Sequence, residues 1–375
     1  MKILELCHFS AGGCGVWTRA REESIRLSKL GHEVKVFSSN FVKGSDEIAP
    51  KNERVGKVEI TRFPAKHLGG EAFFYWNCKK EALDFSPDII FTHNYRQYNT
   101  HLALHVAKKL RKSGKKCKVF LVTHAPFVEG DITRSFIAKR IVGFYDKFIG
   151  QKTLNKFDKI LTISGWEIPC LMKCGAHKNK IVYIPNGIPE EFFRQKKLKE
   201  EHKILFLGRI APKKKLETLI EAIPLINDKK IKFEIVGPEE KNYFNMLKKL
   251  VAELKLNKRI NFSPPVFDIK EKIKKIDSAK IYVLPSRVEG MPQSLIEAMA
   301  REKIVIGSDS IAIRDLIIDG KNGHLFEFDN PKDLAEKIDL ALSVKNKSMQ
   351  KNARKSVEQF SWDKIIIKIE KLISS

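Results

Sequence analysis

The chain has 375 residues, which is longer than one hydrophobic core usually accommodates and predicts two domains of ordinary size. Apolar residues make up 43% and charged residues 31%, and no stretch approaches the roughly 18 consecutive apolar residues of a membrane-spanning helix. The N-terminus MKILELCHFSAGG starts with a strand pattern and lacks the regions of a signal peptide, so we expect a cytoplasmic protein. Six scattered cysteines without CxxC spacing favour neither a zinc site nor a disulfide framework.

The charge balance indicates the kind of partner but not its identity. Seventy Lys and Arg residues against 45 Asp and Glu residues give a net charge of +25, which favours anionic partners. Nucleic acid, a membrane surface and phosphorylated small molecules all fit. Lys-rich and Glu-rich surfaces are also typical of thermophilic ion-pair networks, so the charge alone selects no function.

In the first half of the chain, short β-branched runs alternate with helical patterns. Such alternation predicts a parallel sheet covered by helices on both faces. The predicted strands span residues 3–9, 32–39, 58–64, 88–94, 117–126, 159–164 and 180–186.

The segment PEEFFRQKKLKEEHK is charged, has no strand pattern and follows the turn PNG, so we predict an inter-domain linker at 189–203. The alternation then restarts, which predicts a second doubly wound domain. The tail FSWDKIIIKIEKLISS has the pattern of an amphipathic helix that packs back onto the first domain. The predicted strands span 203–209, 232–237, 259–265, 280–286, 303–309 and 324–328, and the clearest helices 216–226 and 242–256. The predicted divisions are 1–188, 189–203, 204–358 and 359–375.

Every candidate motif directly follows a predicted strand. Open parallel sheets bind ligands beyond the carboxyl ends of their strands. Two such domains facing each other define a deep cleft, and we expect the motifs to line it.

The first strand leads into the glycine-rich stretch SAGGCGVWTRAREES. Gly12, Gly13 and Gly15 permit a tight turn and a close backbone approach, before a helix whose N-terminus would suit a phosphate. A nicotinamide cofactor would need an acidic residue after the second strand, where the chain has Ser38 and Ser39. A dehydrogenase is therefore disfavoured, and a glycine-rich connection without a ligand is the alternative.

Two further strand ends carry basic side chains. In LGRIAPKKKLETL, Arg209 offers a planar fork and Lys214 a mobile charge, a pair that suits a diphosphate. A solvated basic turn is the alternative, and it is the preferred interpretation for Lys213 and Lys215. His124 ends the strand pattern VFLVTHAP, so we expect its ring to project toward the cleft, although a lone histidine is more often structural.

The stretch SRVEGMPQSLIEAMA at 286–300 contains two carboxylates eight positions apart. Ser294 and Glu297 form S-x-x-E directly before an apolar run, which predicts a capping box at a helix start. Glu289 instead precedes Gly290 and Pro292 in an exposed, irregular turn. Backbone N–H groups and the positive helix end would there hold a polyhydroxylated or anionic ligand.

With these residues in hand, a family resemblance becomes visible. EGMPQSLIEAMA resembles the E-x7-E signature of retaining glycosyltransferases of the GT-B fold, family 4. The glycine loop, GHEVKVFS, His124, PNGI, GRIAPKKK, FEIVG, VLPS, DGKNGHLF and FSW follow in family order over nearly the whole chain. The resemblance implies an α/β protein of two Rossmann-like domains, the first for an acceptor and the second for a nucleotide-sugar donor.

The resemblance also implies a role for each motif. Arg209 and Lys214 would bind the donor diphosphate and neutralise the leaving group, and Glu297 would hold the ribose hydroxyls. Glu289 would meet the donor sugar and His124 a far hydroxyl of that sugar. The other implied donor contacts are Gly12, Gly13, Gly15, Val266, Gly290, Met291, Pro292, Gln293 and Ser294.

Such enzymes retain the sugar's configuration through an oxocarbenium-like state, in which the donor phosphate accepts the acceptor's proton. Preorganised cations would then be the main catalytic contribution, and closure of the domains would exclude water. The chain lacks a D-x-D motif, which fits a reaction that needs neither metal nor cofactor. We expect a glycan or lipid-linked acceptor, in cell-surface polysaccharide or glycoconjugate synthesis.

The basic and aromatic stretch 139–152 and the basic stretch 111–118 are compatible with peripheral attachment to anionic lipid at the inner face of a membrane. Nucleic acid is not an expected partner, because the chain has no recognition module. A basic nucleic-acid-binding protein is thus a distant alternative, which would bind DNA or RNA with steep salt dependence. A GT-B epimerase or phosphorylase would share the fold, and product analysis separates these from a transferase.

Three motifs depart from the family pattern, at five positions. AMAREKIVI has Arg301, Glu302 and Ile304 at small or proline positions, Asp315 stands at the later acidic position, and Lys215 replaces a preferred glycine. These departures lie beside the expected ligand. We therefore expect them to influence which donor sugar binds more than whether the chain is active.

Overall fold

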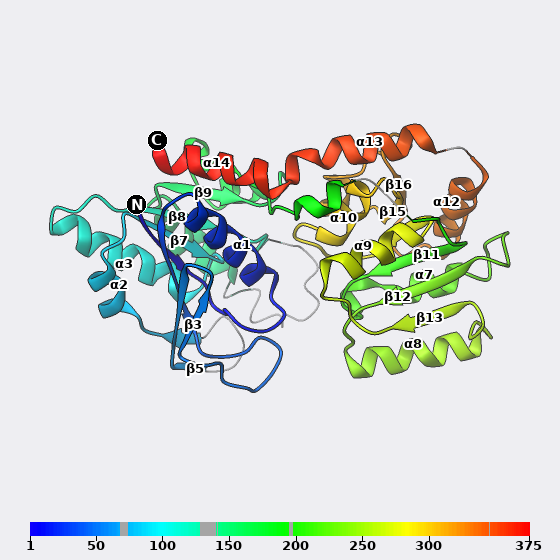
Figure 1. Cartoon of the computed structure of the whole chain (residues 1–375), viewed down its shortest axis with the longest axis horizontal. Helices are drawn as coiled ribbons and strands as arrows, with labels where there is room; N and C mark the ends of the chain where they lie inside the picture. Colours follow the sequence, from blue (N-terminus) through cyan, green and yellow to red (C-terminus); the bar gives the residue numbers. More distant parts are fainter. Residues whose placement is uncertain (68–73, 128–139, 141, 195–197, 345) are drawn as a thin grey trace. The chain divides into compact units, whose positions relative to one another are not determined.

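The computed structural model describes all residues except 68–73, 128–139, 141, 195–197 and 345. The chain forms two compact units, each a parallel sheet between layers of helices (Figure 1). The first unit comprises Met1–Phe127, Ile132–Pro185 and the C-terminal segment Ile365–Ser375, and the second comprises Asn186–Lys364. The two doubly wound domains predicted from the sequence are therefore present.

The first unit contains an eight-stranded sheet with the order β10-β9-β8-β7-β1-β2-β4-β3, parallel except for β3 against β4. Its strands are β1 (Lys2–Leu6), β2 (Glu33–Ser39), β3 (Asn52–Val55), β4 (Val58–Phe63), β7 (Ile89–His93), β8 (Lys118–Val122), β9 (Lys159–Thr162) and β10 (Ile181–Tyr183). A separate antiparallel pair comprises β5 (Ala65–His67) and β6 (Phe74–Trp76). The helices are α1 (Gly15–Lys29), α2 (Lys79–Phe85), α3 (Tyr98–Lys112), the π-helix η2 (Tyr145–Gly150), α5 (Gln151–Leu154), α6 (Glu167–Lys173), the 3₁₀ turn η3 (Lys178–Lys180) and α14 (Trp362–Ser374).

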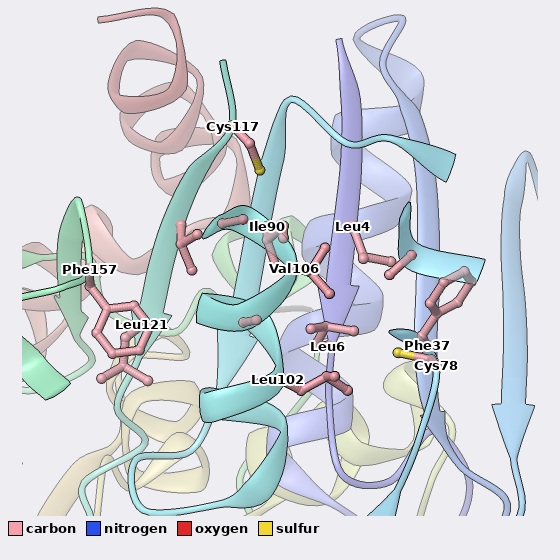
Figure 2. Packing of buried hydrophobic residues seen from close by; sticks show 14 of the residues in the cluster. Leu4, Leu6, Phe37, Cys78, Ile90, Leu102, Val106, Cys117, Leu121 and Phe157 are labelled. Atoms are coloured by element: carbon pink, nitrogen blue, oxygen red, sulfur yellow. The ribbon is translucent and has the colours of Figure 1, made fainter. Parts of the chain in front are cut away.

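The core of the first unit lies between the sheet and α3. Apolar runs such as KILEL and IIFTH form central strands that are buried along almost their whole length, as parallel strands covered on both faces require. Figure 2 shows Leu102 and Val106 of α3 packed toward Leu4, Leu6 and Ile90 of the sheet. Burial on this scale fixes the strand ends that carry polar side chains.

The second unit contains a six-stranded, fully parallel sheet with the order β13-β12-β11-β14-β15-β16. Its strands are β11 (Lys203–Leu207), β12 (Lys232–Val236), β13 (Ile260–Ser263), β14 (Ile281–Leu284), β15 (Ile304–Ser308) and β16 (His324–Phe326). The helices are η4 (Glu190–Phe193), η5 (Pro212–Lys214), α7 (Leu216–Ala222), α8 (Lys241–Glu253), α9 (Ile269–Ser278), α10 (Gln293–Ala300), α11 (Ile311–Arg314), α12 (Pro331–Ser343), α13 (Lys347–Val357) and η6 (Glu358–Phe360), of which η4, η5 and η6 are 3₁₀ turns.

Every predicted strand overlaps an observed one, whereas β3, β5 and β6 were not predicted. The sequence of β3, NERV, is short, charged and mostly exposed, so it lacks an apolar pattern. The helix predicted at 216–226 ends as α7 at Ala222, two residues before Pro224, because a proline lacks the N–H that would continue the helix.

Two of the family motifs meet each other in the second unit. A Cβ atom at Gly187 of the PNGI turn would lie 2.4 Å from the Trp362 ring of the FSW motif, so only glycine fits there. The Ile188 N–H donates to the Phe360 carbonyl at 2.7 Å, and the Trp362 N–H donates to the Ile188 carbonyl at 3.1 Å. The start of the second unit is therefore joined to its last turn.

Arg301, one of the departures from the family pattern, and the nearby Lys303 are buried cations that hold η4 and the segment after it. Arg301 donates to both carboxylate oxygens of Asp277, at 2.8 and 2.6 Å, and to the carbonyl oxygens of Phe192 and Arg194. Lys303 is fully buried and donates to Glu200 and to two backbone carbonyls. These cations have structural partners, so they are not free to bind a ligand.

None of the described helices is long and apolar enough to cross a membrane. All six cysteines are free thiols.

Candidate functional site

The second sheet reverses its strand order between β11 and β14, and the predicted donor residues follow these two strands. Open α/β sheets bind ligands at such a switch point, beyond the carboxyl ends of the strands. Arg209 and Lys214 come from the connection after β11. Glu289 and α10 come from the connection after β14.

The connection after β11 is shaped by tight backbone packing. A Cβ atom at Gly237, which has a φ of +153°, would lie 1.9 Å from the Gly208 carbonyl oxygen, so the glycine of FEIVG permits the LGR turn. Lys215 has φ 51° and ψ 45°, the left-handed region that favours glycine. Its side chain forms ion pairs with Asp329 at 2.9 Å and Glu217 at 3.3 Å. The family's preference for glycine at this position thus has a backbone cause.

Lys214 and Glu289 form an ion pair across the switch point, and each side chain is only 12% exposed. The prediction of an exposed turn at Glu289 is therefore wrong, because the β11 connection covers this carboxylate. Arg209 is exposed and, within the described part of the chain, its side chain makes no ion pair. Among the described side chains, Lys214 is thus paired, whereas Arg209 makes no ion pair.

The predicted capping box at the start of α10 does not form. The helix begins directly after Pro292, its N-cap residue, so Ser294 already lies inside the first turn. The Tyr282 hydroxyl donates to the Ser294 hydroxyl oxygen at 2.7 Å. The Tyr282 hydroxyl also lies 3.1 Å from the Leu207 carbonyl oxygen. Ser294 therefore joins α10 to the ends of β14 and β11.

Glu297 faces α9 instead of capping its own helix. Its side chain is 5% exposed, and the Lys272 Nζ lies 2.6 Å from Oε1 and 2.5 Å from Oε2. Burial raises the pKa of Glu297, and Lys272 opposes this rise. Lys272 was not predicted, because nothing in the sequence links it to a residue 25 positions away.

The remaining predicted donor contacts follow β13 and β14 along the chain. The Met291 Sδ atom accepts a hydrogen bond from the Asn186 N–H at 3.3 Å. Gly290, Gln293 and Val266 are partly exposed, and Val266 follows β13. The structure thus gathers these residues at one edge of the second sheet.

The first sheet reverses its order between β1 and β7, and the glycine loop follows β1. Gly12 has φ +81°, and a Cβ atom there would lie 2.5 Å from the Lys43 carbonyl oxygen. At Gly13 and Gly15, by contrast, no heavy atom of the described chain lies within 4 Å of a Cβ position. The local backbone therefore requires glycine at position 12. At position 13 the space next to the Cα atom, just before α1, is unoccupied by the described chain.

His124 follows β8 in a strained turn, with φ 55° at His124 and 54° at Ala125. The buried Glu167 carboxylate accepts hydrogen bonds from the Thr123 hydroxyl at 2.5 Å and from the Ala125 N–H at 2.8 Å. It also accepts from the N–H groups of 163 and 164. Glu167 therefore holds the residues on both sides of His124, through the Thr123 side chain and the Ala125 backbone.

The His124 ring is connected to the interior of the sheet. Its Nε2 lies 2.8 Å from Nδ1 of His93, and His93 Nε2 lies 2.7 Å from Glu5 Oε2. Sequence reasoning missed His93 and Glu5, although His93 ends the strand pattern DIIFTHN and the rule that selected His124 would also have selected it. Burial lowers the pKa values of both histidines, to about 4 for His93.

The described residues contain no cluster of three His, Cys, Asp or Glu side chains suited to a metal ion.

Comparison with known proteins identifies the class to which this fold and site belong. The profile of Glycosyltransferase Family 4 matches residues 13–192, and that of Glycosyl transferases group 1 matches residues 187–356. An uncharacterized glycosyltransferase of Methanocaldococcus jannaschii is 27% identical over 380 residues, covering 96% of this chain and 94% of that protein. The chain belongs to family 4 of the glycosyltransferases and is an enzyme of the hexosyltransferase type.

One further related sequence and one similar crystal structure extend the comparison. A PP-undecaprenol alpha-1,4-N-acetyl-D-galactosaminyltransferase of Campylobacter jejuni is 27% identical over 205 residues, or 51% of this chain and 55% of that enzyme. The crystal structure of Anabaena HepE in complex with UDP and glucose matches with a TM-score of 0.75 at 16% identity, over 100% of this chain and 99% of that one. The predicted GT-B fold is thereby confirmed.

Proposed function

We propose that this enzyme transfers a hexose, with retention of configuration, from a nucleotide-diphosphate sugar to a glycan or lipid-linked acceptor. The observation that carries the proposal is the Lys214–Glu289 pair at the switch point, with Arg209, which makes no ion pair among the described residues, on the same connection as Lys214. One carboxylate and two cations at this place suit a ligand that combines a polyhydroxylated sugar with a diphosphate.

In this proposal the arriving diphosphate exchanges partners with the ion pair. Lys214 moves its hydrogen bonds from Glu289 to phosphate oxygens, and Arg209 adds a second cation. The released Glu289 carboxylate then accepts hydrogen bonds from sugar hydroxyls. As the bond between C1 of the sugar and the phosphate oxygen breaks, the two cations stabilise the developing negative charge.

The same cations provide the electrostatic role that a divalent metal would have, so we propose a metal-independent reaction. The acceptor oxygen bonds to C1 on the face that the phosphate leaves, and the departing phosphate takes the acceptor's proton. Glu297, held by Lys272, would bind the ribose hydroxyls of the nucleotide.

A direct test measures binding and turnover of a donor panel on the full chain. Thermal shifts with UDP, GDP and their glucose, N-acetylglucosamine, N-acetylgalactosamine and mannose derivatives identify the base and sugar, because a bound ligand raises the melting temperature. The anomeric configuration of the transferred or hydrolysed sugar is then read by NMR. Inversion at C1, or activity lost in chelator and restored by magnesium, would contradict the proposal.

The same products separate the alternatives. An epimerase would change the sugar while it remains on the nucleotide, and a phosphorylase would require free phosphate. A nucleic-acid-binding protein would show no donor-dependent thermal shift and would bind DNA or RNA more weakly as salt rises.

For the acceptor, we propose a lipid-linked glycan and peripheral attachment to an anionic membrane. The name of the Campylobacter relative gives a PP-undecaprenol-linked substrate. In this chain, Phe144, Phe148 and Ile149 around η2 are 61%, 52% and 42% exposed, and Lys147 lies beside Phe148. Exposed apolar side chains among lysines suit an anionic lipid surface. Positions 139 and 141 of the predicted stretch lie outside the described residues.

The attachment is tested by sedimentation with phosphatidylglycerol vesicles. The double substitution Phe144→Ser and Phe148→Ser should abolish most of the binding seen at low salt, whereas the matched change Phe267→Ser, at a side chain that is 82% exposed in the second unit, should not. Wild-type binding should weaken as the Debye length falls below about 10 Å. Absence of binding at low salt would end the membrane proposal.

A further inference from the structure

Three polar side chains from adjacent strands form one hydrogen-bonded chain inside the first unit. Glu5 lies on β1, His93 ends β7, and His124 follows β8, and these strands are neighbours in the sheet. Glu5 and His93 are fully buried, whereas His124 is partly exposed. The chain therefore leads from the closed interior to an accessible ring.

The surroundings of Glu5 favour its neutral form. Its Oε2 has His93 as a partner, but its buried Oε1 has no hydrogen-bond partner among the described residues. An ionised carboxylate left with one donor in a fully buried place would be costly. A protonated carboxyl donates its O–H to His93 Nε2 and leaves only a neutral carbonyl oxygen unpaired, which costs less. Burial accordingly raises the pKa of Glu5 to about 8, although Arg19 opposes this rise.

A neutral Glu5 determines the position of each proton along the chain. His93 Nε2 accepts a hydrogen bond from the O–H of Glu5. A neutral His93 therefore carries its hydrogen on Nδ1 and donates a hydrogen bond from this N–H to His124 Nε2. His124 Nε2 is then an acceptor, which places the hydrogen of a neutral His124 on Nδ1. Within the described part of the chain, His124 Nδ1 has no hydrogen-bond partner of its own.

We propose that Glu5 and His93 are positioning residues that set the tautomer of His124, so that its Nδ1–H faces outward as a hydrogen-bond donor to an oxygen of the donor sugar. The sugar contact rests on the proposed function; the tautomer does not. Glu167 complements this role by accepting hydrogen bonds from the Thr123 hydroxyl and the Ala125 N–H of the same turn.

The arrangement makes the outward face of His124 depend on the protonation of Glu5. When Glu5 ionises, its carboxylate accepts the Nε2–H of His93, and His93 Nδ1 accepts the Nε2–H of His124. The outward Nδ1 of His124 then becomes an acceptor. The charged and titratable groups acting on this chain are Arg19 and Glu23 of α1 and Cys7 after β1. The Arg19–Glu23 pair, at 2.8 Å, is itself buried.

The tautomer is measured directly by long-range ¹H–¹⁵N NMR on the full chain labelled at histidine, with His124→Gln used to assign the signal. The expected result is an Nδ1–H tautomer at pH 7, which changes to Nε2–H as the pH rises through about 8. In Glu5→Gln, whose amide N–H donates to His93 as the neutral acid does, His124 should remain Nδ1–H across this range. An Nε2–H tautomer at pH 7, or the same switch in Glu5→Gln, would overturn the proposal.

Kinetics with the best donor from the panel test the consequence for the sugar. Wild-type kcat should fall above about pH 8, and Glu5→Gln should remove this fall. Glu5→Leu and His93→Phe should lower kcat about three- to tenfold at pH 7 with an unchanged KM, the size expected for one neutral hydrogen bond. The exposed His105→Asn serves as the control and should have no effect. Absence of turnover with any donor would refute the proposed function, while the NMR result would still decide the tautomer.

Discussion

The two sheets carry polar groups at equivalent switch points, but the groups of the second sheet are charged and those of the first are neutral. Between β11 and β14, Lys214 and Glu289 form a charged pair that retains some contact with solvent. Between β1 and β7, Glu5 and His93 are completely buried, and the neutral forms of both are favoured. A charged pair near water exchanges partners with an ionic ligand at modest cost, whereas a buried neutral chain keeps a fixed direction. The charged pair of the second sheet suits the binding of an ionic ligand, and the neutral chain of the first sheet suits the orientation of the His124 ring.

The sharpest test of the charged side is Glu289→Ala. We expect kcat to fall about a hundredfold, because the sugar loses the group that positions it. Stability should fall by about 1 kcal/mol, since a partly covered ion pair is lost. Glu289→Gln should also tighten the binding of the nucleoside diphosphate alone, because Lys214 becomes free. The exposed Glu253→Gln is the control, and full activity in Glu289→Ala would contradict the assignment of this turn as the sugar site.

We expect the adjacent glycines Gly12 and Gly13 to differ in role, the first in folding and the second in donor binding. Gly13→Ala adds a Cβ atom to open space, so it should leave the melting temperature unchanged and lower donor turnover about tenfold by blocking close backbone approach. Gly12→Ala should lower stability by at least about 1 kcal/mol, because its φ of +81° and the nearby Lys43 carbonyl exclude a side chain. Equal effects of the two substitutions on stability would refute this distinction.

Substitutions of Glu297 and Lys272 test the proposed contact between Glu297 and the ribose of the donor nucleotide. Glu297→Gln should raise the donor KM about tenfold and change kcat little, since ribose binding is lost in ground and transition states alike. Lys272→Met leaves the buried carboxyl without its cation, so its pKa rises further and the donor KM should increase as the pH falls. A pH-independent KM in Lys272→Met would indicate that Glu297 does not contact the nucleotide.

The neutral chain should be visible in folding as well as in activity. A carboxyl with a raised folded-state pKa contributes stability that is complete below 4.5 and is lost as the pH rises to about 8. Gln does not ionise, so the stability of Glu5→Gln relative to the wild type should increase by about 1 kcal/mol per pH unit over this window and then level off. Denaturant titrations at several pH values measure this difference, and a constant difference would show that Glu5 is ionised throughout.

The strands and the strand-end motifs were predictable because they depend on local patterns of apolar residues. The partners of the site residues were not. The capping box at Ser294 failed because Pro292 starts the helix two residues too early for a serine cap. Glu5 was overlooked because a glutamate within KILEL resembles the outward position of a half-exposed strand, whereas helices cover both faces of this one. Lys272 acts through a contact made only when distant segments come together. His93 could have been selected from its place at a strand end, but its contacts with Glu5 and His124 could not.

The burial of Arg301 and Lys303 has a practical consequence for dividing the protein. Their acceptors include backbone carbonyls of 192 and 194 and the carboxylate of Glu200, all upstream of the first strand of the second sheet. A C-terminal fragment that begins at Ile204 would leave both cations short of partners in a dry interior, and we expect it to aggregate. A fragment of Asn186–Lys364 keeps these acceptors together with the Gly187–Trp362 contact, which makes it the natural fragment for testing whether the second unit binds a nucleotide by itself.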